Sequence, residues 1–349
     1  MEETRKVVEA LMKVGPRFSD ISRATGIPVS TVRYILLKRL PKLGLSIGAS
    51  VNYGALGLQR YLVTFQSNYP VHYISKILDL LGEYAYLDYY TYLMTEKKFL
   101  TIFAIPPSYE EDLLDFLNLL ESMNLIKEMD TCKLIYMRPL PFMTEFFDFS
   151  RGVWIQDWIS MRKSREVPEI PEYPDPQPKI DEIDLVLVKE LQKGIIPLKY
   201  SIIARKFNLT RQTISKHYKH ARNLINFFTV FWVPHMNPQL FILPLMVRVK
   251  AREDFRKLLL SIPFTHAEFR SERGDYFTML LIPNVGSYIT LKFITNSLDT
   301  ISIDFQDMEY SGKFAIQCNL FKGGSWINVF DEVAKKLMLF VKSRSGQLQ

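Results

Sequence analysis

Basic and amide side chains gather in one short stretch, residues 199–222 (KYSIIARKFNLTRQTISKHYKHAR), which carries seven Lys or Arg and no acidic residue. From Thr210, a residue type preferred at a helix N-cap, apolar residues recur at helical spacing, so the polar side chains share the opposite face. Arg, Lys and Gln match phosphates and base edges in the major groove, as in the second helix of a helix-turn-helix. A solvated basic helix face would show the same charges. The residues predicted here to bind DNA are Arg211, Gln212, Ser215, Lys216, Lys219 and Arg222.

A weaker version of this stretch occurs near the N-terminus, where GIPVSTVRYILLKRL (26–40) aligns with NLTRQTISKHYKHAR (208–222) at a constant offset. Pro41 is expected to end this helix early, because proline lacks a backbone N–H. The outward face offers fewer groups that match base edges. We therefore expect the second copy to read the bases and the first to clamp phosphates or to dock a protein. The residues predicted to bind DNA in the first copy are Ser30, Arg33, Lys38 and Arg39.

Groups suited to metal or covalent chemistry are sparse. Five histidines occur, at positions 72, 217, 220, 235 and 266, and none pair at metal-ligand spacing. His217 is expected to be a hydrogen-bonded core residue and His220 part of the basic face. Cys132 and Cys318 are the only cysteines and form no CxxC motif, so we predict no metal and no cofactor. No Ser/His/Asp set, paired carboxylates or phosphate loop stands out, so no catalytic residue is predicted.

Length and composition set the broad class. The chain has 349 residues, of which 48% are hydrophobic, and 44 Lys and Arg exceed 37 Asp and Glu to give a net charge of +7. This favours a globular, moderately basic protein with two or more domains. The N-terminus does not read as a signal peptide, and no apolar run approaches the roughly 18 residues that a membrane span needs. We expect a soluble, cytoplasmic protein.

The two halves of the chain repeat one plan. FLTIFAIP (99–106) and YFTMLLIP (276–283) are nearly the same string, and each lies in a predicted β-α-β-β-α-β order, the ferredoxin-like arrangement. Each is preceded by a predicted helix-turn-helix with wing strands. The fold class is therefore α+β, as two tandem winged helix-turn-helix plus ferredoxin-like units that form an intramolecular pseudo-dimer.

Further segments follow each sheet. GVWIQDW (152–158) and GSWINVF (324–330) are each expected to open a Trp-bearing amphipathic helix, the second of which packs on its own half. Five prolines between residues 167 and 181 indicate an extended linker. The predicted domains are 1–53 (winged helix 1), 54–141 (ferredoxin-like 1), 142–181 (Trp helix and linker), 182–236 (winged helix 2), 237–320 (ferredoxin-like 2) and 321–349 (C-terminal helix).

A winged helix-turn-helix followed by a βαββαβ module resembles the Lrp/AsnC transcriptional regulators. LGLSIGASVNYGALGL (43–58) and FFTVFWVPHMNP (227–238) look like the family's wing and its passage into the first sheet strand, and RGDYFTMLLI (273–282) is similar to its G-D-Y-D turn. The resemblance implies sequence-specific binding of double-stranded DNA and pairing of the two sheets. It also implies a small-molecule effector site at the sheet interface, for which Gly274 and Asp275 are the candidates. The chain would act as a monomeric pseudo-dimer or as a homodimer.

Two alternatives stay open. One is a protein-interaction module that modulates the transcription machinery with weak DNA affinity. The other is an enzyme, because His266 followed by Arg270 also resembles the siroheme decarboxylases, where such side chains would hold propionates or supply a proton. The segment that follows the histidine in that family is absent here. The sequence is therefore predicted to encode a DNA-binding transcriptional regulator rather than an enzyme.

Overall fold

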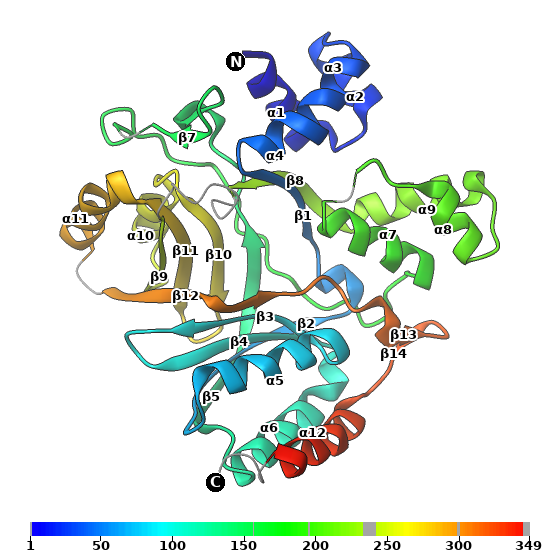
Figure 1. Cartoon of the computed structure of the whole chain (residues 1–349), viewed down its shortest axis with the longest axis vertical. Coiled ribbons are helices and arrows are strands. Elements are labelled where there is room, and N and C mark those ends of the chain that lie inside the picture. Colours follow the sequence, from blue (N-terminus) through cyan, green and yellow to red (C-terminus); the bar gives the residue numbers. More distant parts are fainter. Residues whose placement is uncertain (1, 156, 195, 233–241, 299–300, 345–349) are drawn as a thin grey trace.

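The chain folds into two helical groups, a two-stranded sheet and a central barrel (Figure 1). The two strands of the small sheet are those predicted as wings, and they are called the wing strands below. The computed structural model describes residues 2–155, 157–194, 196–232, 242–298 and 301–344. The mixed α+β class predicted from sequence is confirmed. Within these ranges no helix is both long and apolar enough to cross a bilayer.

Each half opens with short helices whose apolar spacing marks their buried faces. Val7, Val8 and Leu11 are fully buried in the first helix of the chain, and Leu187 and Val188 in its counterpart. The helices of the two groups are α1 (Glu2–Val14), α2 (Phe18–Thr25), α3 (Val29–Tyr34), α4 (Leu40–Lys42), α7 (Glu182–Gln192), α8 (Tyr200–Lys206) and α9 (Arg211–Asn223).

The helix after α3 does not stop at Pro41. Residues Ile35–Arg39 form a π-helical turn, in which the N–H of Leu40 donates to the carbonyl of Ile35. Pro41 then lies in the first turn of α4, where its missing N–H leaves no bond unmade. The prediction that Pro41 ends this helix early is wrong, because the wide turn restarts the helix just before the proline.

The wing strands of the two halves pair with each other. β1 (Leu45–Val51) runs antiparallel to β8 (Ile225–Trp232), with Leu45 opposite Trp232. Gly194, just after α7, has φ +69°, and a Cβ placed there would lie 1.9 Å from the carbonyl oxygen of Ile47. The second helical group thus touches the wing strand of the first half through a position that requires glycine.

Eight strands form one closed antiparallel barrel in the order β10-β11-β9-β12-β3-β4-β2-β5. Each half contributes four adjacent strands, and the halves join where β12 pairs with β3 and where β5 pairs with β10. The two expected sheets therefore merge at both edges, which leaves neither with a free edge. The strands are β2 (Gln59–Gln66), β3 (Leu87–Leu93), β4 (Lys98–Ile105), β5 (Lys127–Pro139), β9 (Ile242–Lys250), β10 (Thr265–Ser271), β11 (Asp275–Pro283) and β12 (Ile301–Lys313).

Apolar side chains fill the barrel, and helices accompany each half. Phe269 and Phe277 stack inside it with ring centroids 4.5 Å apart. The helices that follow strands of the barrel are α5 (Val71–Tyr84), α6 (Glu110–Ser122), α10 (Glu253–Leu260) and α11 (Ser287–Ser297). In Figure 1 the helices of the first half lie below the barrel and those of the second half at its left.

The segments after each sheet cross to the other half. α12 (Phe330–Arg344) packs on α6 of the first half, where the rings of Phe330 and Phe116 are 5.6 Å apart (Figure 1). In the opposite direction, Trp158 from the first half lies 5.9 Å from Phe264 of the second. The prediction that the C-terminal helix packs on its own half is therefore wrong.

The first tryptophan of each of these segments lies on a short strand. Trp154 belongs to β7 (Val153–Trp154), which pairs with β6 (Phe147–Asp148), and Trp326 belongs to β14 (Ser325–Trp326), which pairs with β13 (Phe321–Lys322). The prediction that each segment opens a Trp-bearing helix is wrong for the first segment, because residues 157–181 contain no helix. After the second segment the expected helix, α12, is present, but it begins four residues beyond Trp326, because the pairing of β13 with β14 takes the backbone hydrogen bonds there.

A buried acid joins the two halves. Glu268 on β10 is fully buried and accepts hydrogen bonds from Arg138 on β5 at 2.7 and 2.9 Å and from Arg256 on α10 at 2.9 and 3.0 Å. Tyr276 donates to the same carboxylate. Burial alone would raise the pKa of Glu268, but the two guanidinium groups outweigh it and hold the pKa below its ordinary value.

Candidate functional site

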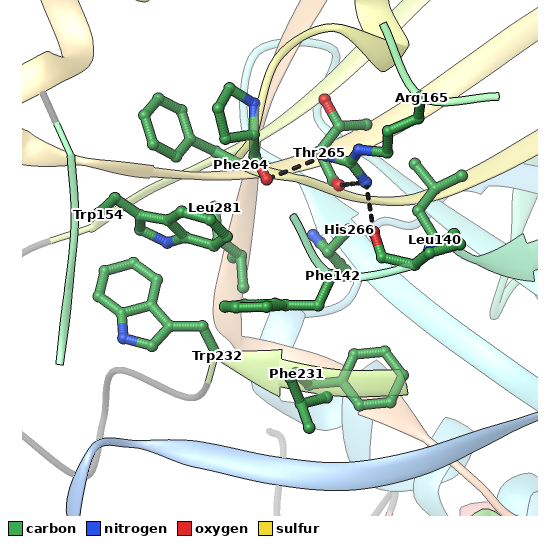
Figure 2. Close-up of a pocket in the computed structure, with 13 residues that line it drawn as sticks. Leu140, Phe142, Trp154, Arg165, Phe231, Trp232, Phe264, Thr265, His266 and Leu281 are labelled. Atoms are coloured by element: carbon green, nitrogen blue, oxygen red, sulfur yellow. Dashed lines mark hydrogen bonds between the residues drawn. The ribbon is translucent and has the colours of Figure 1, made fainter. Parts of the chain in front are cut away.

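A cavity of about 30 Å³ lies where the wing strands meet the second half of the barrel (Figure 2). It is walled by β8, the start of β10 and the loop after β5, and β7 and the linker from the first half complete it. The residues that line it are Leu140, Pro141, Phe142, Trp154, Arg165, Val230, Phe231, Trp232, Pro263, Phe264, Thr265, His266 and Leu281.

Aromatic rings form one side of this cavity. Trp154 lies 4.8 Å from Phe142, 5.6 Å from Phe264 and 6.3 Å from Trp232 between ring centroids. Figure 2 shows the two indoles at one end of the cavity, with His266 and Arg165 toward the other. The indole N–H of Trp232 is buried and has no hydrogen-bond partner among the described residues. An unsatisfied donor in an aromatic wall is suited to a polar group on a flat ligand.

Arg165 supplies a buried cation that forms no ion pair with an acid among the described residues, although Glu268 and Glu145 lie near enough to act on its charge. Its terminal nitrogens donate to the carbonyls of Ile262 and Thr265 at 2.7 Å, of Pro263 at 3.0 Å and of Pro141 at 3.3 Å. No carboxylate among the described residues pairs with it, and its buried Nε has no partner. Burial lowers its pKa to about 10, so the side chain is still positive at neutral pH.

His266 occupies a bulge of β10, where the pairing with β11 shifts between Thr265 and Ala267. Its carbonyl accepts from the N–H of Leu140 at 2.8 Å, but its buried Nδ1 has no partner among the described residues. Burial, together with the smaller effect of the positive charges of Lys313 and Arg165, lowers the pKa of His266 to about 3. The imidazole is therefore neutral at physiological pH and can accept a proton if an anion enters.

The first half has a cavity at the same place, and it is electrically neutralised. Asp88 occupies the matching bulge of β3, and its carbonyl accepts from the N–H of Phe314 at 2.9 Å. Tyr53 donates to Asp88 at 2.7 Å, and Arg60 lies 3.3 Å from Asp88 and 2.5 Å from Glu172. This cavity measures about 20 Å³. Arg60 does not line this cavity itself, but it is paired with Asp88, which does, and with Glu172. Among the described residues, the two cavities therefore differ in charge: the first holds an acid that is already paired with a cation, and the second holds His266 and Arg165.

The residues predicted to bind DNA lie mostly on the surface. Arg211, Gln212, Lys216 and Lys219 are exposed on α9, and Ser215 is half-buried beside them. Two of the predicted residues bond to the backbone of the chain: Arg222 donates to the carbonyl of Ile225 at 3.0 Å, and Arg39 donates to the carbonyl of Phe149 at 3.4 Å. The other residues of the first copy, Ser30, Arg33 and Lys38, are exposed.

The predicted effector residues lie away from the cavity. Gly274 is in the turn between β10 and β11, with φ +78°, and Asp275 accepts from Arg248 at 2.9 Å and from Lys250 at 2.7 Å. Asp275 lines a separate cavity of about 200 Å³ at the other end of the barrel. Arg270 donates to Glu169 at 2.6 Å and does not line the cavity of His266. The structure therefore does not bring together the histidine and arginine that the enzyme alternative paired.

The fold is that of an α+β protein made of two similar halves around one barrel. It matches two crystal structures of the siroheme decarboxylase NirDL over nearly the full length of both chains. One match has a TM-score of 0.58 at 11% identity and covers 97% of this chain and 99% of that one. The other, a co-complex with an iron-uroporphyrin III analogue, has a TM-score of 0.56 at 12% identity and covers 98% and 99%. No family model and no curated protein sequence matches the chain.

These matches correct the main functional prediction. The two solved structures described above are those of an enzyme, and one of them holds an iron-uroporphyrin III analogue rather than DNA. The predictions of a Lrp/AsnC transcriptional regulator, of double-stranded DNA and the transcription machinery as partners, and of a protein without enzymatic activity are therefore wrong. At this identity the likeness shows the fold alone.

Sequence reasoning missed most of the cavity. Arg165 lies just before the proline-rich segment, in a region read as linker, and Trp232 was read only as wing. The match between Asp88 and His266 comes from the bulges of β3 and β10. At the constant offset between FLTIFAIP and YFTMLLIP, His266 falls opposite Tyr89, so the sequence repeat did not point to this pair.

Proposed function

We propose that this cavity receives a carboxylate of an iron tetrapyrrole of the siroheme class and that the chain catalyses its decarboxylation. The observation that carries the proposal is the buried guanidinium of Arg165, which forms no ion pair with an acid among the described residues, next to the unpartnered Nδ1 of His266. A buried cation without a counter-ion favours the entry of an anion. The full-length likeness to the siroheme decarboxylase NirDL names the class of substrate.

The size of the cavity limits what enters it. A space of about 30 Å³ is on the scale of one water molecule and far too small for a macrocycle, so at most one small group of the substrate, such as a carboxylate, enters it. The macrocycle therefore rests at the mouth while one of its acidic side chains extends inward. The rings of Trp154, Phe142 and Trp232 offer it apolar and aromatic contacts.

The reaction breaks the bond between the carboxylate carbon and its neighbour. R–CH2–COO⁻ and H⁺ give R–CH3 and CO2, and the electron pair left on the CH2 carbon takes the proton. Iron and the conjugated macrocycle of the substrate supply the electronic stabilisation of that carbon. Arg165 Nε–H orients the carboxylate, and His266 is the titratable group in reach of it. Once the anion offsets the charges of Arg165 and Lys313, the pKa of His266 rises, which lets its ring carry the proton.

We also propose that each half is a winged helix-turn-helix unit followed by a ferredoxin-like unit. The repeated order of helices and strands supports this division, as does the matching bulge at Asp88 and His266. The proposed boundaries are those expected from sequence, at 53/54, 141/142, 181/182, 236/237 and 320/321. The boundary at 236/237 lies outside the described residues.

The test uses the full-length chain with two probes. Binding of iron-uroporphyrin III is followed by its visible absorbance, and turnover of siroheme by mass spectrometry, in which each step removes one CO2. We expect His266→Ala to weaken binding by about 10-fold or more, since a hydrogen bond to a charged group contributes about 1.5–3 kcal/mol, and to abolish turnover. Tyr86→Phe is the matched control, because Tyr86 lines the equivalent cavity of the first half.

Two results would overturn the proposal. One is tetrapyrrole binding and turnover that are equal in His266→Ala and in the wild type. The other is the absence of both binding and turnover in the wild-type protein. Far-UV circular dichroism of each variant separates loss of the site from loss of the fold.

A further inference from the structure

Two histidines and two aspartates converge between α7 and α9, far from the cavity. His217 Nδ1 lies 3.0 Å from Asp184 Oδ1 and 3.3 Å from Asp181 Oδ2, and His220 Nδ1 lies 2.7 Å from Asp184 Oδ2. One donor atom from each of Asp181, Asp184 and His217 falls within 4.8 Å of the others. Sequence spacing does not reveal this cluster, because its members lie on different helices; Asp184 and His217, for example, are 33 residues apart in the chain.

The carboxylates in this cluster are held in place by backbone groups. Asp181 is the N-cap of α7, and one of its oxygens accepts from the N–H groups of Ile183 and Asp184 at 2.9 and 2.8 Å. Asp184 Oδ2 accepts in return from the N–H of Asp181 at 3.2 Å. These bonds leave Asp181 Oδ2 and Asp184 Oδ1 directed at His217. Ligands oriented by outer hydrogen bonds of this kind are a feature of protein metal sites.

The first half shows that the fold does not require this cluster. By the repeat of buried positions, Thr4 of α1 corresponds to Asp184 and Ile35 corresponds to His217. Thr4 and Ile35 are both buried, and they offer neither a carboxylate nor an imidazole to a cation. The two acids and the two histidines are thus an addition confined to the second half.

We propose that Asp181, Asp184 and His217 bind a divalent transition metal of the zinc class, with His220 or water as the fourth ligand. Zinc takes imidazole nitrogen and carboxylate oxygen at about 2.0–2.2 Å, which places tetrahedral ligand atoms about 3.3–3.6 Å apart. The observed separations of 3.0 and 3.3 Å need only a small adjustment. Asp184 is buried, whereas the Asp181 side chain is 49% exposed, so the ion can enter from solvent.

Such a metal would fasten α7 to α9, and it is independent of the tetrapyrrole proposal. The test uses untagged full-length protein, stripped with a chelator and titrated with ZnCl2 against a chromophoric competitor. We expect one zinc per chain with a Kd in the micromolar range or below, and a thermal midpoint that rises with zinc concentration. Co²⁺ in place of zinc should give the visible spectrum of a tetrahedral site.

Three variants decide the outcome. His217→Ile, which copies the residue of the first half, should weaken zinc binding about 100-fold. Asp181→Asn keeps the N-cap, since asparagine caps as well as aspartate, and should weaken binding about 10-fold. His72→Gln, an exposed histidine elsewhere, should leave the Kd unchanged. A wild-type Kd above about 1 mM, or an equal Kd in the wild type and Asp181→Asn, would refute the site.

Discussion

Replacing Glu268 with glutamine should destabilise the protein by about 3–5 kcal/mol at pH 7, because it leaves two buried guanidinium groups without their shared acid. The amide keeps the shape of the side chain but loses its charge. Two unit charges about 4 Å apart interact by about 4 kcal/mol at an effective dielectric constant near 20. Arg138 and Arg256 each lose one such partner, and only Arg256 keeps another, Glu169, at 3.4 Å.

The assay is urea unfolding followed by tryptophan fluorescence, with a double-mutant cycle. Arg138→Met alone should cost less than Glu268→Gln, because Glu268 keeps Arg256 and Tyr276. The double variant should be less damaging than the sum of the two singles, since removing the acid no longer strands Arg138. A loss below about 1 kcal/mol for Glu268→Gln, or strict additivity, would refute the reasoning.

The pH dependence of the same variant has a definite sign. The folded-state pKa of Glu268 is lowered, so its contribution is fully present above its unfolded value and is lost as pH falls through the folded pKa. The difference in stability between the wild type and Glu268→Gln should therefore shrink below about pH 4, the ordinary range of glutamate.

The remaining predictions concern single sites. The pKa of His266 is about 3 in the folded protein, so as the pH falls the unfolded chain takes up a proton on this residue first. The free energy of unfolding should therefore fall by up to about 1.4 kcal/mol per pH unit below about pH 6.5. Urea unfolding of His266→Gln should lack this contribution to the pH dependence. Gly194→Ala should destabilise by well over 1 kcal/mol because its Cβ would meet Ile47, whereas Gly274→Ala, with no atom within 4 Å, should carry only the cost of a positive φ; thermal unfolding compares the two. Thr210→Ala should cost about 1 kcal/mol, since Thr210 caps α9 by accepting from Thr213, and urea unfolding measures this loss; an unchanged midpoint would contradict it.

The local structure followed from local patterns. The short apolar runs FLTIFAIP and YFTMLLIP predicted β4 and β11 nearly residue for residue, and the helical spacing after Thr210 predicted α9. These elements are set by side-chain period and capping, which a short window of sequence contains. The repeat also told us that both halves share one order of elements.

The packing of the segment after each sheet on the opposite half could not be predicted in the same way. Because the two copies present similar apolar surfaces, the sequence of α12 does not say whether Phe330 packs on the first half or on the second. The prediction of DNA binding failed for a related reason. A basic helix face such as that of Arg211 and Lys216 has the same composition whether it contacts phosphate or water. The cation of the cavity, Arg165, depends on four carbonyls distant in sequence, which only the folded chain brings together.

Because the segment after each sheet crosses to the other half, neither half contains the whole of the cavity around His266, here called the chamber. Trp154 and Arg165 belong to the N-terminal portion, whereas His266 and Phe264 belong to the C-terminal one. A chain cleaved in the proline-rich segment would give two fragments, each lacking part of the chamber, and only their reassociation would rebuild it. The covalent link therefore keeps the two parts of the chamber close together. A substitution that loosens the contact between the halves would open the chamber without altering any residue that lines it.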